Sequence, residues 1–290
     1  MHNLVLFCKT FIRDLDRIKT LKASVDKFNA DKIPFCIVCP EAETDIFKRQ
    51  LITGKEDYEL IFFTDEEVTG KELSKKYESK GWVGQQFAKL LFYKKNICNF
   101  YVILDSDLYF IQNFYIKDFM HDDNTPYTSM IEEKKDSYIA IQNYLKRKGK
   151  PYSFVRHGQV FSKTLLEDME ANLLLENNLT FEDLLEISPF EMQWYGEYYM
   201  LTRPFKLHPC SNLFKYFWGE DTYFDARIKG LTVEDFIKAG FIGILMQTYH
   251  LKDKVYKPSL FFVLIKKMRT IPRRTRNFIK NHILPRFKNK

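Results

Sequence analysis

The sequence predicts an α/β fold, with a mixed and mostly parallel central sheet flanked by helices. Three observations predict it. Short apolar strands alternate with amphipathic helices over the first hundred residues, the most apolar strand ends in acids, and 45% of the 290 residues are hydrophobic. Alternating strands and helices are typical of parallel sheets with crossover helices. A chain of this length and composition can bury a sizeable core.

The first elements are marked by changes in the spacing of apolar residues. In order they are a strand over 3–8, a loop over 10–14, a helix over 15–28, a strand over 33–39, a helix over 41–51 and a strand over 59–63. The first helix has apolar residues at Leu15, Ile18, Leu21, Val25 and Phe28. The chain therefore opens as a β–loop–α unit and continues the alternation.

A helix over 82–95 leads into the next strand, 100–104. Its predicted buried face holds Val83, Phe87, Leu90 and Leu91, and another face holds Gln85, Gln86, Lys89 and Tyr93. Because this helix precedes a strand that ends in acids, we expect Lys89 near a bound phosphate. A solvated surface lysine is the alternative.

The strand 100–104 ends in Asp105-Ser106-Asp107, and the next apolar run, 108–111, follows too closely for a helix. Open α/β sheets place ligands just beyond the carboxyl ends of their strands. Two carboxylates one residue apart can converge on one hard cation, which can in turn hold a diphosphate. The tripeptide therefore predicts a site for a metal and a nucleotide-sugar, with turn and capping chemistry as the alternative.

The pattern becomes less regular after residue 111. The expected elements are a loop over 122–126, a polar helix over 134–148, a loop running into a short strand over 156–161, helices over 164–175, 181–187 and 231–239, and a strand over 241–247. Gly158 is expected to let the backbone approach a ligand closely.

Aromatic residues crowd around two acids in the segment 189–199, as in an acceptor pocket for a sugar. Glu191 and Glu197 can each act as a general base, and Glu191 is favoured. An amphipathic helix with solvated glutamates is the alternative. The run Trp218-Gly219-Glu220-Asp221 makes Asp221 a further candidate base, or the start of a helix whose acids suit the helix dipole.

His250 follows the last predicted strand and is a candidate third metal ligand, although lone histidines usually bind no metal. The five cysteines have no framework spacing, which favours a reducing compartment. Cys36 and Cys39 face opposite sides of a predicted strand, so we interpret both as buried apolar residues.

We expect a cytoplasmic protein. The apolar run 4–7 is too short for a signal peptide, and no run approaches the roughly 20 apolar residues of a membrane span.

The C-terminal tail differs from the rest in charge. Residues 252–290 hold 13 Lys and Arg against Asp253, a net charge of +12, which leaves −5 for residues 1–251 out of +7 overall. Apolar residues recur in the tail with helical spacing. A basic amphipathic helix of this kind suits an anionic membrane surface; a solvated terminal helix is the alternative. Nucleic acid is not expected, because the body is acidic and lacks a recognised binding module.

Several segments resemble GT-A-fold glycosyltransferases over roughly residues 3–250. The resemblance rests on Gly84-Gln85-Gln86 to Lys89-Leu90, on Tyr101 to Asp107 and on the β–α unit that ends at 9–14. It is closest to a bacterial group associated with surface polysaccharides, often described as a domain family of unknown function. It implies a GT-A (Rossmann-like) catalytic domain over 1–251, with a donor half over about 1–112, an acceptor half over 113–251 and the tail 252–290 outside it.

The resemblance also implies roles for particular residues. Asp105 and Asp107 match the motif that holds a divalent cation, Mn²⁺ or Mg²⁺, on the donor diphosphate. The residues expected to bind the donor are Lys9, Thr10, Asp14, Gln86, Lys89, Asp105 and Ser106.

On the acceptor side, 190–196 resembles a later motif of the group, and 218–221 is similar to an element of some inverting galactosyltransferases that competes for the role of base. His250 with Lys257-Pro258 resembles an element of some retaining enzymes, with spacing one residue longer and without the intervening glycine. The stereochemistry therefore stays open.

The predicted function is transfer of a sugar from a nucleotide donor, a UDP-sugar, to a growing glycan or lipid-linked glycan such as capsule or lipopolysaccharide. The tail would hold the enzyme on the cytoplasmic face of the inner membrane. One alternative is an aspartate-nucleophile phosphatase, although small residues normally stand in its signature where this chain has Leu108 and Tyr109. The other is a non-catalytic, membrane-docked binding protein.

Overall fold

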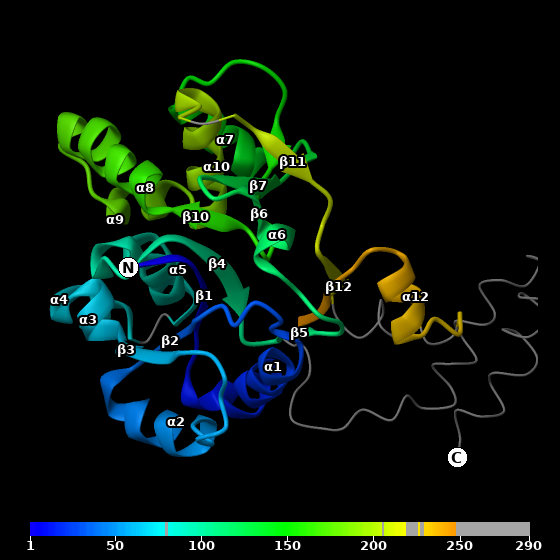
Figure 1. Ribbon diagram of the computed structural model, residues 1–290. Helices are drawn as coiled ribbons and strands as arrows, with labels where there is room; N and C mark the ends of the chain where they lie inside the picture. Colours follow the sequence, from blue (N-terminus) through cyan, green and yellow to red (C-terminus); the bar gives the residue numbers. More distant parts are fainter. Residues whose placement is uncertain (79–80, 205, 219–225, 227–228, 248–290) are drawn as a thin grey trace, which may run out of the picture. The chain divides into compact units, whose positions relative to one another are not determined.

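The computed structural model describes residues 1–78, 81–204, 206–218, 226 and 229–247 (Figure 1). These residues belong to the first of two units into which the chain divides, Met1–Thr248. The predictions for Asp221, for His250 and for the tail 252–290 lie outside the described residues. None of the described helices is long and apolar enough to span a membrane.

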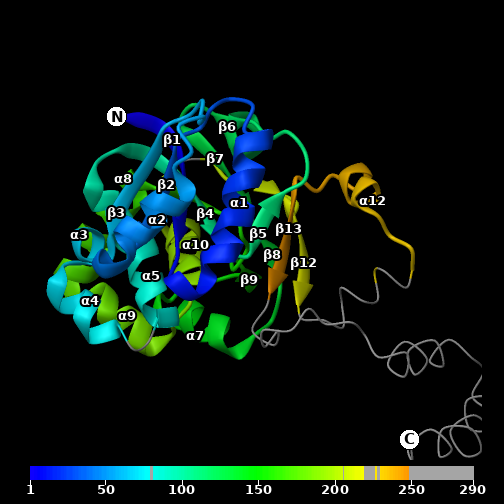
Figure 2. The same cartoon turned by 90° about the horizontal axis from the view of Figure 1, so that it is seen from below.

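A five-stranded sheet with the strand order β10-β4-β1-β2-β3 forms the centre of this unit (Figures 1 and 2). Its strands are β1 (His2–Lys9), β2 (Phe35–Cys39), β3 (Leu60–Thr64), β4 (Cys98–Asp105) and β10 (Val160–Ser162). The first four are parallel, and β10 is antiparallel to β4. The α/β fold with a mostly parallel central sheet is therefore confirmed.

Both faces of the sheet are buried, which explains why its strands are continuous apolar runs. Val5 and Phe7 of β1 face one core, to which α5 (Gly81–Leu91), α8 (Lys163–Met169), α9 (Phe181–Ile187) and α10 (Glu191–Thr202) contribute. Leu4 and Leu6 face the other core, against α1 (Leu15–Phe28) and α2 (Thr44–Leu51). Figure 2 shows α1 and α2 over that second face. Each buried side chain of this size stabilises the fold by about 1.5–3 kcal/mol.

The described part of the chain contains further helices. They are α3 (Asp65–Thr69), α4 (Lys71–Tyr77), α6 (Ile116–Phe119), α7 (Asp136–Tyr144) and α12 (Val233–Lys238). Turns of 3₁₀ helix span Ile12–Asp14, Glu41–Glu43, Phe92–Lys95 and Leu175–Asn177, and a π-helical turn spans Glu170–Leu174. The helices expected over 41–51, 82–95 and 164–175 are therefore each an α-helix with such turns at one end.

Helices α3 and α4 are absent from the sequence-based expectation, because the segment 65–78 is mostly charged and has few apolar residues to show a period. The local signal that marks α3 is a capping box. The Thr64 hydroxyl accepts from the Glu67 amide at 3.1 Å, and the Glu67 carboxylate accepts from the Thr64 amide at 2.7 Å.

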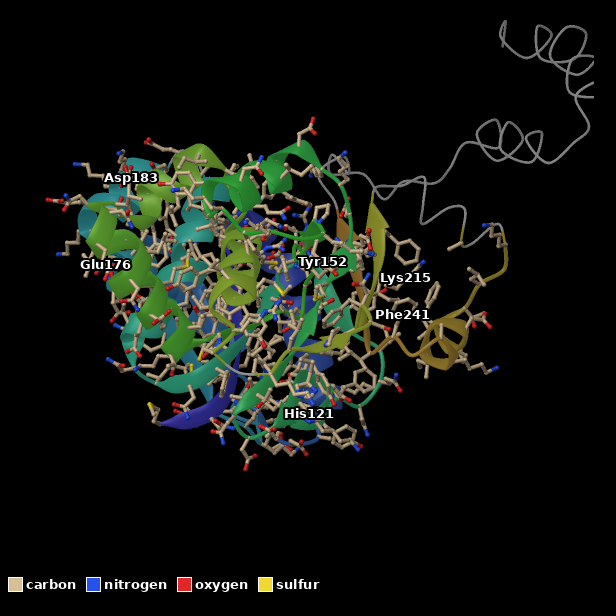
Figure 3. All side chains as sticks on the ribbon, turned by 90° about the horizontal axis from the view of Figure 1, so that it is seen from above. His121, Tyr152, Glu176, Asp183, Lys215 and Phe241 are labelled. Carbon is tan, nitrogen blue, oxygen red and sulfur yellow. The ribbon has the colours of Figure 1, made fainter. Side chains whose placement is uncertain are left out.

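The described residues of the unit also form three small sheets. Strands β6 (Met120–Asp122), β7 (Thr125–Ser129) and β11 (His208–Cys210) form one, and β8 (Ile131–Glu132) pairs with β9 (Tyr152–Ser153). The third contains β5 (Leu108–Phe110), β12 (Phe214–Trp218) and β13 (Gly243–Gln247). Figure 3 labels Lys215 and Phe241 beside this third sheet, where the lysine Nζ lies 5.8 Å from the ring centroid.

The chain changes sheets between Asp105 and Leu108. Strand β4 ends in the central sheet, while β5 is antiparallel to β13 in the third small sheet. The predicted sharp break at Asp105-Ser106-Asp107 is therefore a crossing from one sheet to another.

Gly158 has a positive φ of 82°, in the region that favours glycine. A Cβ at this position would lie 2.6 Å from a ring carbon of Phe214, and the Gly158 amide donates to the Ile103 carbonyl at 2.9 Å. The structure thus gives this glycine a role in close packing of the loop against β12 and β4, and its expected approach to a ligand stays a prediction.

Candidate active site

The carboxyl ends of the parallel strands meet at one edge of the sheet. Asp105 is the last residue of β4, and the register places Lys9 of β1 beside it. Asp65 directly follows β3 and begins α3. Acidic and basic side chains therefore gather where open α/β sheets bind their ligands.

Asp105 contacts three polar side chains. Lys89 Nζ lies 3.1 Å and Gln85 Nε2 lies 3.3 Å from Oδ1, while His157 Nδ1 lies 3.5 Å from Oδ2. Burial alone would raise the pKa of this carboxyl, but Lys89 and His157 outweigh it and hold the pKa below its ordinary value. Asp105 is therefore a carboxylate at neutral pH.

Lys89 joins Asp105 to Glu191. Its ammonium is buried and lies 3.0 Å from Glu191 Oε1. Burial lowers the pKa of Lys89, and the two acids raise it above its ordinary value. Burial raises the pKa of Glu191, against the effect of Lys89. Three elements, α5, β4 and α10, thus bring together three of the residues predicted for the site.

Asp107 is in a different environment. Among the described residues its Oδ1 is buried and has no hydrogen-bond partner. Burial and the nearby charge of Asp105 raise its pKa to about 7. A cavity of about 140 Å³ lies beside it, lined also by Ser106 and Arg17. The free oxygen and the space next to it are suited to a bound ligand.

The acid pair fits a hard divalent cation. Carboxylate oxygens are the donors that Mg²⁺ and Mn²⁺ prefer, and Asp107 Oδ1 has no other partner in the described part of the chain. Asp105 Oδ2 faces the His157 ring at 3.5 Å and is the second available oxygen. Over the described ranges no group of three His, Cys, Asp or Glu could hold a metal. Strand β13 runs alongside this pair, because the Met246 amide donates to the Asp107 carbonyl at 3.0 Å.

A larger cavity, of about 420 Å³, lies at the ends of β1, β2 and β3. Lys9 lines it, pairs with Asp65 Oδ2 at 2.9 Å and lies 3.6 Å from the centroid of the Phe11 ring. Its other lining residues include Pro40, Glu43, Ser74, Tyr77, Gly81, Gly84 and Phe87. Asp65 Oδ1 is buried and unpartnered among the described residues. A planar ring would find an aromatic side chain and a hydrogen-bond acceptor here.

Three predicted donor residues, Thr10, Asp14 and Gln86, line neither this cavity nor the smaller one beside Asp107. Thr10 is fully buried, and its hydroxyl has no hydrogen-bond partner among the described residues. Asp14 pairs with Arg17 at 2.5 Å. Gln86 is buried and donates to the Trp82 carbonyl of its own helix at 2.9 Å. The structure therefore brings Lys9 to the larger cavity and Lys89 to the acid pair.

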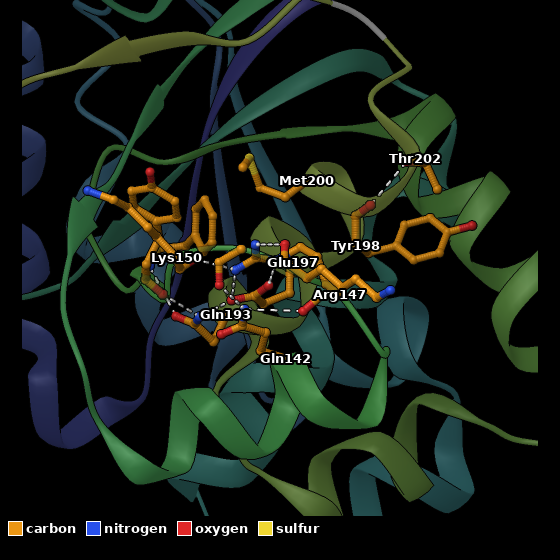
Figure 4. Close-up of polar contacts among 12 residues, drawn as sticks. Gln142, Arg147, Lys150, Gln193, Glu197, Tyr198, Met200 and Thr202 are labelled. Atoms are coloured by element: carbon orange, nitrogen blue, oxygen red, sulfur yellow. Dashed lines mark hydrogen bonds and ion pairs between the residues drawn. The ribbon is translucent and has the colours of Figure 1, made fainter.

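Glu197 lies in a separate buried cluster, drawn in Figure 4. Its carboxylate pairs with Nε and Nη2 of Arg147, the second at 3.1 Å, and accepts from Gln193 Nε2 at 3.1 Å. Arg147 also donates to the carbonyls of Lys148 and Lys150, at 3.1 and 2.9 Å. Glu197 therefore fixes the loop after α7 to helix α10.

We expect Glu197→Gln to lower the free energy of unfolding by about 1–3 kcal/mol. The amide keeps the shape of the side chain but leaves the buried Arg147 charge without its counter-charge. Urea unfolding measures the loss, and the rate of the sugar transfer that the sequence predicts should stay close to that of wild type. A large loss of that predicted activity at unchanged stability would instead give Glu197 the role of base.

Three contacting residues were not identified as site residues from the sequence. Gln85 is on the helical face that also holds Lys89, so the helical period could have found it. His157 reaches Asp105 only because β10 pairs with β4, a non-local contact that the sequence does not reveal. Asp65 directly follows the half-buried strand β3 of the same parallel sheet, and the rule that ligands bind beyond the carboxyl ends of such strands applies to it as it does to Asp105.

Comparison with known proteins gives one family and several distant structures. The model of a family described as "Family of unknown function (DUF6492)" matches residues 3–280. No curated protein matches the chain. Mouse xyloside xylosyltransferase 1, in its apo form, is 12% identical with a TM-score of 0.46, over 84% of this chain and 97% of that one. Core-mannan synthase A from Aspergillus fumigatus, in a Mn/GDP form, is 9% identical with a TM-score of 0.46, over 69% of each chain.

Proposed function

We propose that this chain, which belongs to the family of unknown function (DUF6492), is a metal-dependent glycosyltransferase with a nucleotide-sugar donor. One observation carries the proposal. A carboxylate pair, one oxygen of which is buried and has no partner in the described part of the chain, shares the carboxyl edge of the sheet with a cavity of about 420 Å³. A cation and a diphosphate fit the first feature, and a nucleoside fits the second.

On the donor side, Asp107 Oδ1 and Asp105 Oδ2 would hold Mn²⁺ or Mg²⁺. When bound, the cation neutralises charge on the departing diphosphate. Phe11 and Tyr77 offer rings to the base, and Asp65 Oδ1 can accept one hydrogen bond from a base N–H group. We propose a UDP-sugar as the donor, because the uracil N3–H supplies one such donor.

On the acceptor side, Glu191 is the proposed general base. In an inverting reaction the acceptor oxygen bonds to the sugar carbon, the bond from that carbon to the diphosphate breaks, and Glu191 takes the proton of the hydroxyl. A raised pKa brings this carboxyl closer to the pH at which such a transfer is efficient. Lys89, 3.0 Å away, fixes the carboxylate beside the acid pair.

The proposed acceptor is a growing cell-surface glycan, such as capsule or lipopolysaccharide, extended at the cytoplasmic face of a bacterial inner membrane. The support is the resemblance of the sequence and the net charge of +12 in residues 252–290. Co-sedimentation of the full chain with anionic vesicles, and not with neutral ones, is the expected result. Equal binding to anionic and neutral vesicles would contradict the proposed attachment to an anionic membrane surface.

The test of the donor site is a thermal-shift panel of UDP, GDP, ADP and CDP with and without Mn²⁺. A ligand at a hundred times its Kd stabilises the folded state by about 2.7 kcal/mol, so a bound nucleotide gives a clear rise in Tm. We expect a rise that needs Mn²⁺ and is largest with UDP. If no nucleotide raises Tm, the two alternatives, a phosphatase and a non-catalytic binding protein, are favoured. An assay with a phosphorylated substrate that carries no sugar then distinguishes them, because a phosphatase releases phosphate from it and a binding protein does not.

A further inference from the structure

An aromatic cluster lies beside the acid pair and is used by none of the steps above. Trp82 and Phe190 are in edge contact, with ring centroids 6.1 Å apart, and Tyr138 packs edge-on against Phe190 at 5.4 Å. Lys135 Nζ lies 4.7 Å from the Tyr138 centroid and 4.9 Å from that of Phe190. Three separate elements, α5, α7 and the start of α10, thus build one aromatic group with a cation at one end.

The cluster is continuous with the proposed active site. Trp82, Gln85 and Lys89 share one face of α5 because they are spaced at three and seven positions. The last two contact Asp105, so Trp82 lies on the site face about 10 Å along the helix, at a rise of about 1.5 Å per residue. Phe190 is the N-cap of α10 and directly precedes Glu191, the proposed base.

Trp82 is too exposed for an ordinary core residue. The side chain is 40% exposed, whereas Trp194 of α10 is fully buried. Trp82 also does not line the cavity of about 420 Å³, although its neighbours Gly81 and Gly84 do. The indole is therefore available on a different side of α5 from the proposed nucleotide pocket.

Aromatic surfaces of this kind match one face of a sugar ring. A pyranose presents a set of C–H bonds on one face and hydroxyls around its edge, so a flat ring system can cover the C–H face while the hydroxyls stay hydrated. The edge contacts from Phe190, supported by Tyr138, hold the indole in place. A preorganised aromatic side chain loses little conformational entropy when a ligand stacks on it.

We propose that Trp82, backed by Phe190 and Tyr138, stacks on a sugar ring of the acceptor and holds the glycan in line with the acid pair. This inference rests on the proposed function. It assigns the exposed indole of Trp82 to a sugar ring of the acceptor rather than to the donor. The indole lies about 10 Å along α5 from Lys89, at a rise of about 1.5 Å per residue.

The experiment titrates the full chain with maltose, lactose, cellobiose, mannobiose and diacetylchitobiose and follows the heat of binding by isothermal titration calorimetry, which needs no tryptophan as a reporter. At least one saccharide is expected to bind wild type, and Trp82→Ala should raise its Kd about tenfold. Trp82→Phe, which keeps a flat ring, should recover part of the affinity. Tyr144→Ala is the matched control, because Tyr144 is also 40% exposed but lies at the far end of α7. It should leave the Kd unchanged.

The Mn²⁺-dependent thermal shift with UDP, measured on the same variants, separates this inference from the proposed function. In Trp82→Ala the shift should equal that of wild type. The inference is overturned if wild type binds none of the saccharides, or if Trp82→Ala binds them as well as wild type does. In either case a UDP shift equal to that of wild type would leave the proposed transferase function standing. Loss of the UDP shift in Trp82→Ala would place the indole at the donor site, and this result would also overturn the inference. Failure of both ligands with wild type would remove the proposed function and this inference with it.

Discussion

Asp107→Asn is expected to abolish the Mn²⁺-dependent thermal shift with UDP and to reduce sugar transfer at least about a hundredfold. Among the described residues, the buried Asp107 Oδ1 has no hydrogen-bond partner, and asparagine keeps the shape of the side chain while removing its charge. The two measurements are Tm with and without Mn²⁺ and the rate of transfer. Asp45→Asn, an exposed substitution on α2, is the matched control and should change neither.

The stability of the same variant should also differ from that of wild type in its dependence on pH. The pKa of Asp107 is about 7 in the folded chain against an ordinary value of 3.8. The folded state therefore binds a proton more tightly than the unfolded state, and the stability gained from it is present below about pH 4 and lost as the pH rises through about 7. Without metal, Asp107→Asn should match wild type below about pH 4 and exceed its Tm at pH 8. A lower Tm for the variant at pH 8 would contradict the charge crowding between Asp105 and Asp107.

For wild type, the stabilisation by Mn²⁺ should increase as the pH rises, whereas the stability of the metal-free protein falls. A cation binds the ionised carboxyl, so Mn²⁺ should raise Tm more at pH 8 than at pH 6. An Mn²⁺ effect that does not vary with pH would place the bound cation away from Asp107.

The four parallel strands of the central sheet could be predicted to within two residues, for a physical reason. Both faces of β1, β2 and β4 are buried, so each contains a continuous apolar run, and its short length and β-branched and aromatic residues favour a strand. Asp105 and Asp107 follow from that prediction, since the end of such a strand is where ligands bind. Asp65 shows the limit of this prediction. It also follows a strand of the parallel sheet, but the short helix that it begins has no clear apolar period, so the end of that strand is not recognised as a site from the sequence.

The contacts that join distant segments could not be predicted. Lys89 and Glu191 are about a hundred residues apart, and they meet because α5 and α10 pack on the same face of the sheet. Glu191 and Glu197 looked equivalent in one aromatic segment. Only the packing of α7 against α10 reveals that Arg147 neutralises one of them while Lys89 contacts the other.

Lys89→Met is expected to lower the free energy of unfolding by about 3–5 kcal/mol, because it leaves two carboxylates beside an apolar side chain. Lys89 is 3% exposed and contacts both Asp105 and Glu191. Adding Glu191→Gln should recover part of the loss, since it removes one of the uncompensated charges. Urea unfolding of the two single variants and the double variant measures the coupling.

Lys22→Met is the matched control, and it separates loss of stability from an effect on the site. Lys22 is also a buried lysine with two acidic partners, Asp26 and Glu56, but it lies on α1. Both variants should lose stability. Only in Lys89→Met should Mn²⁺ restore part of it, because a cation on Asp105 replaces the missing ammonium charge. The rise in Tm with Mn²⁺ should therefore be larger in Lys89→Met than in wild type and unchanged in Lys22→Met. Equal rises in all three proteins would mean that the cation and Lys89 do not share Asp105.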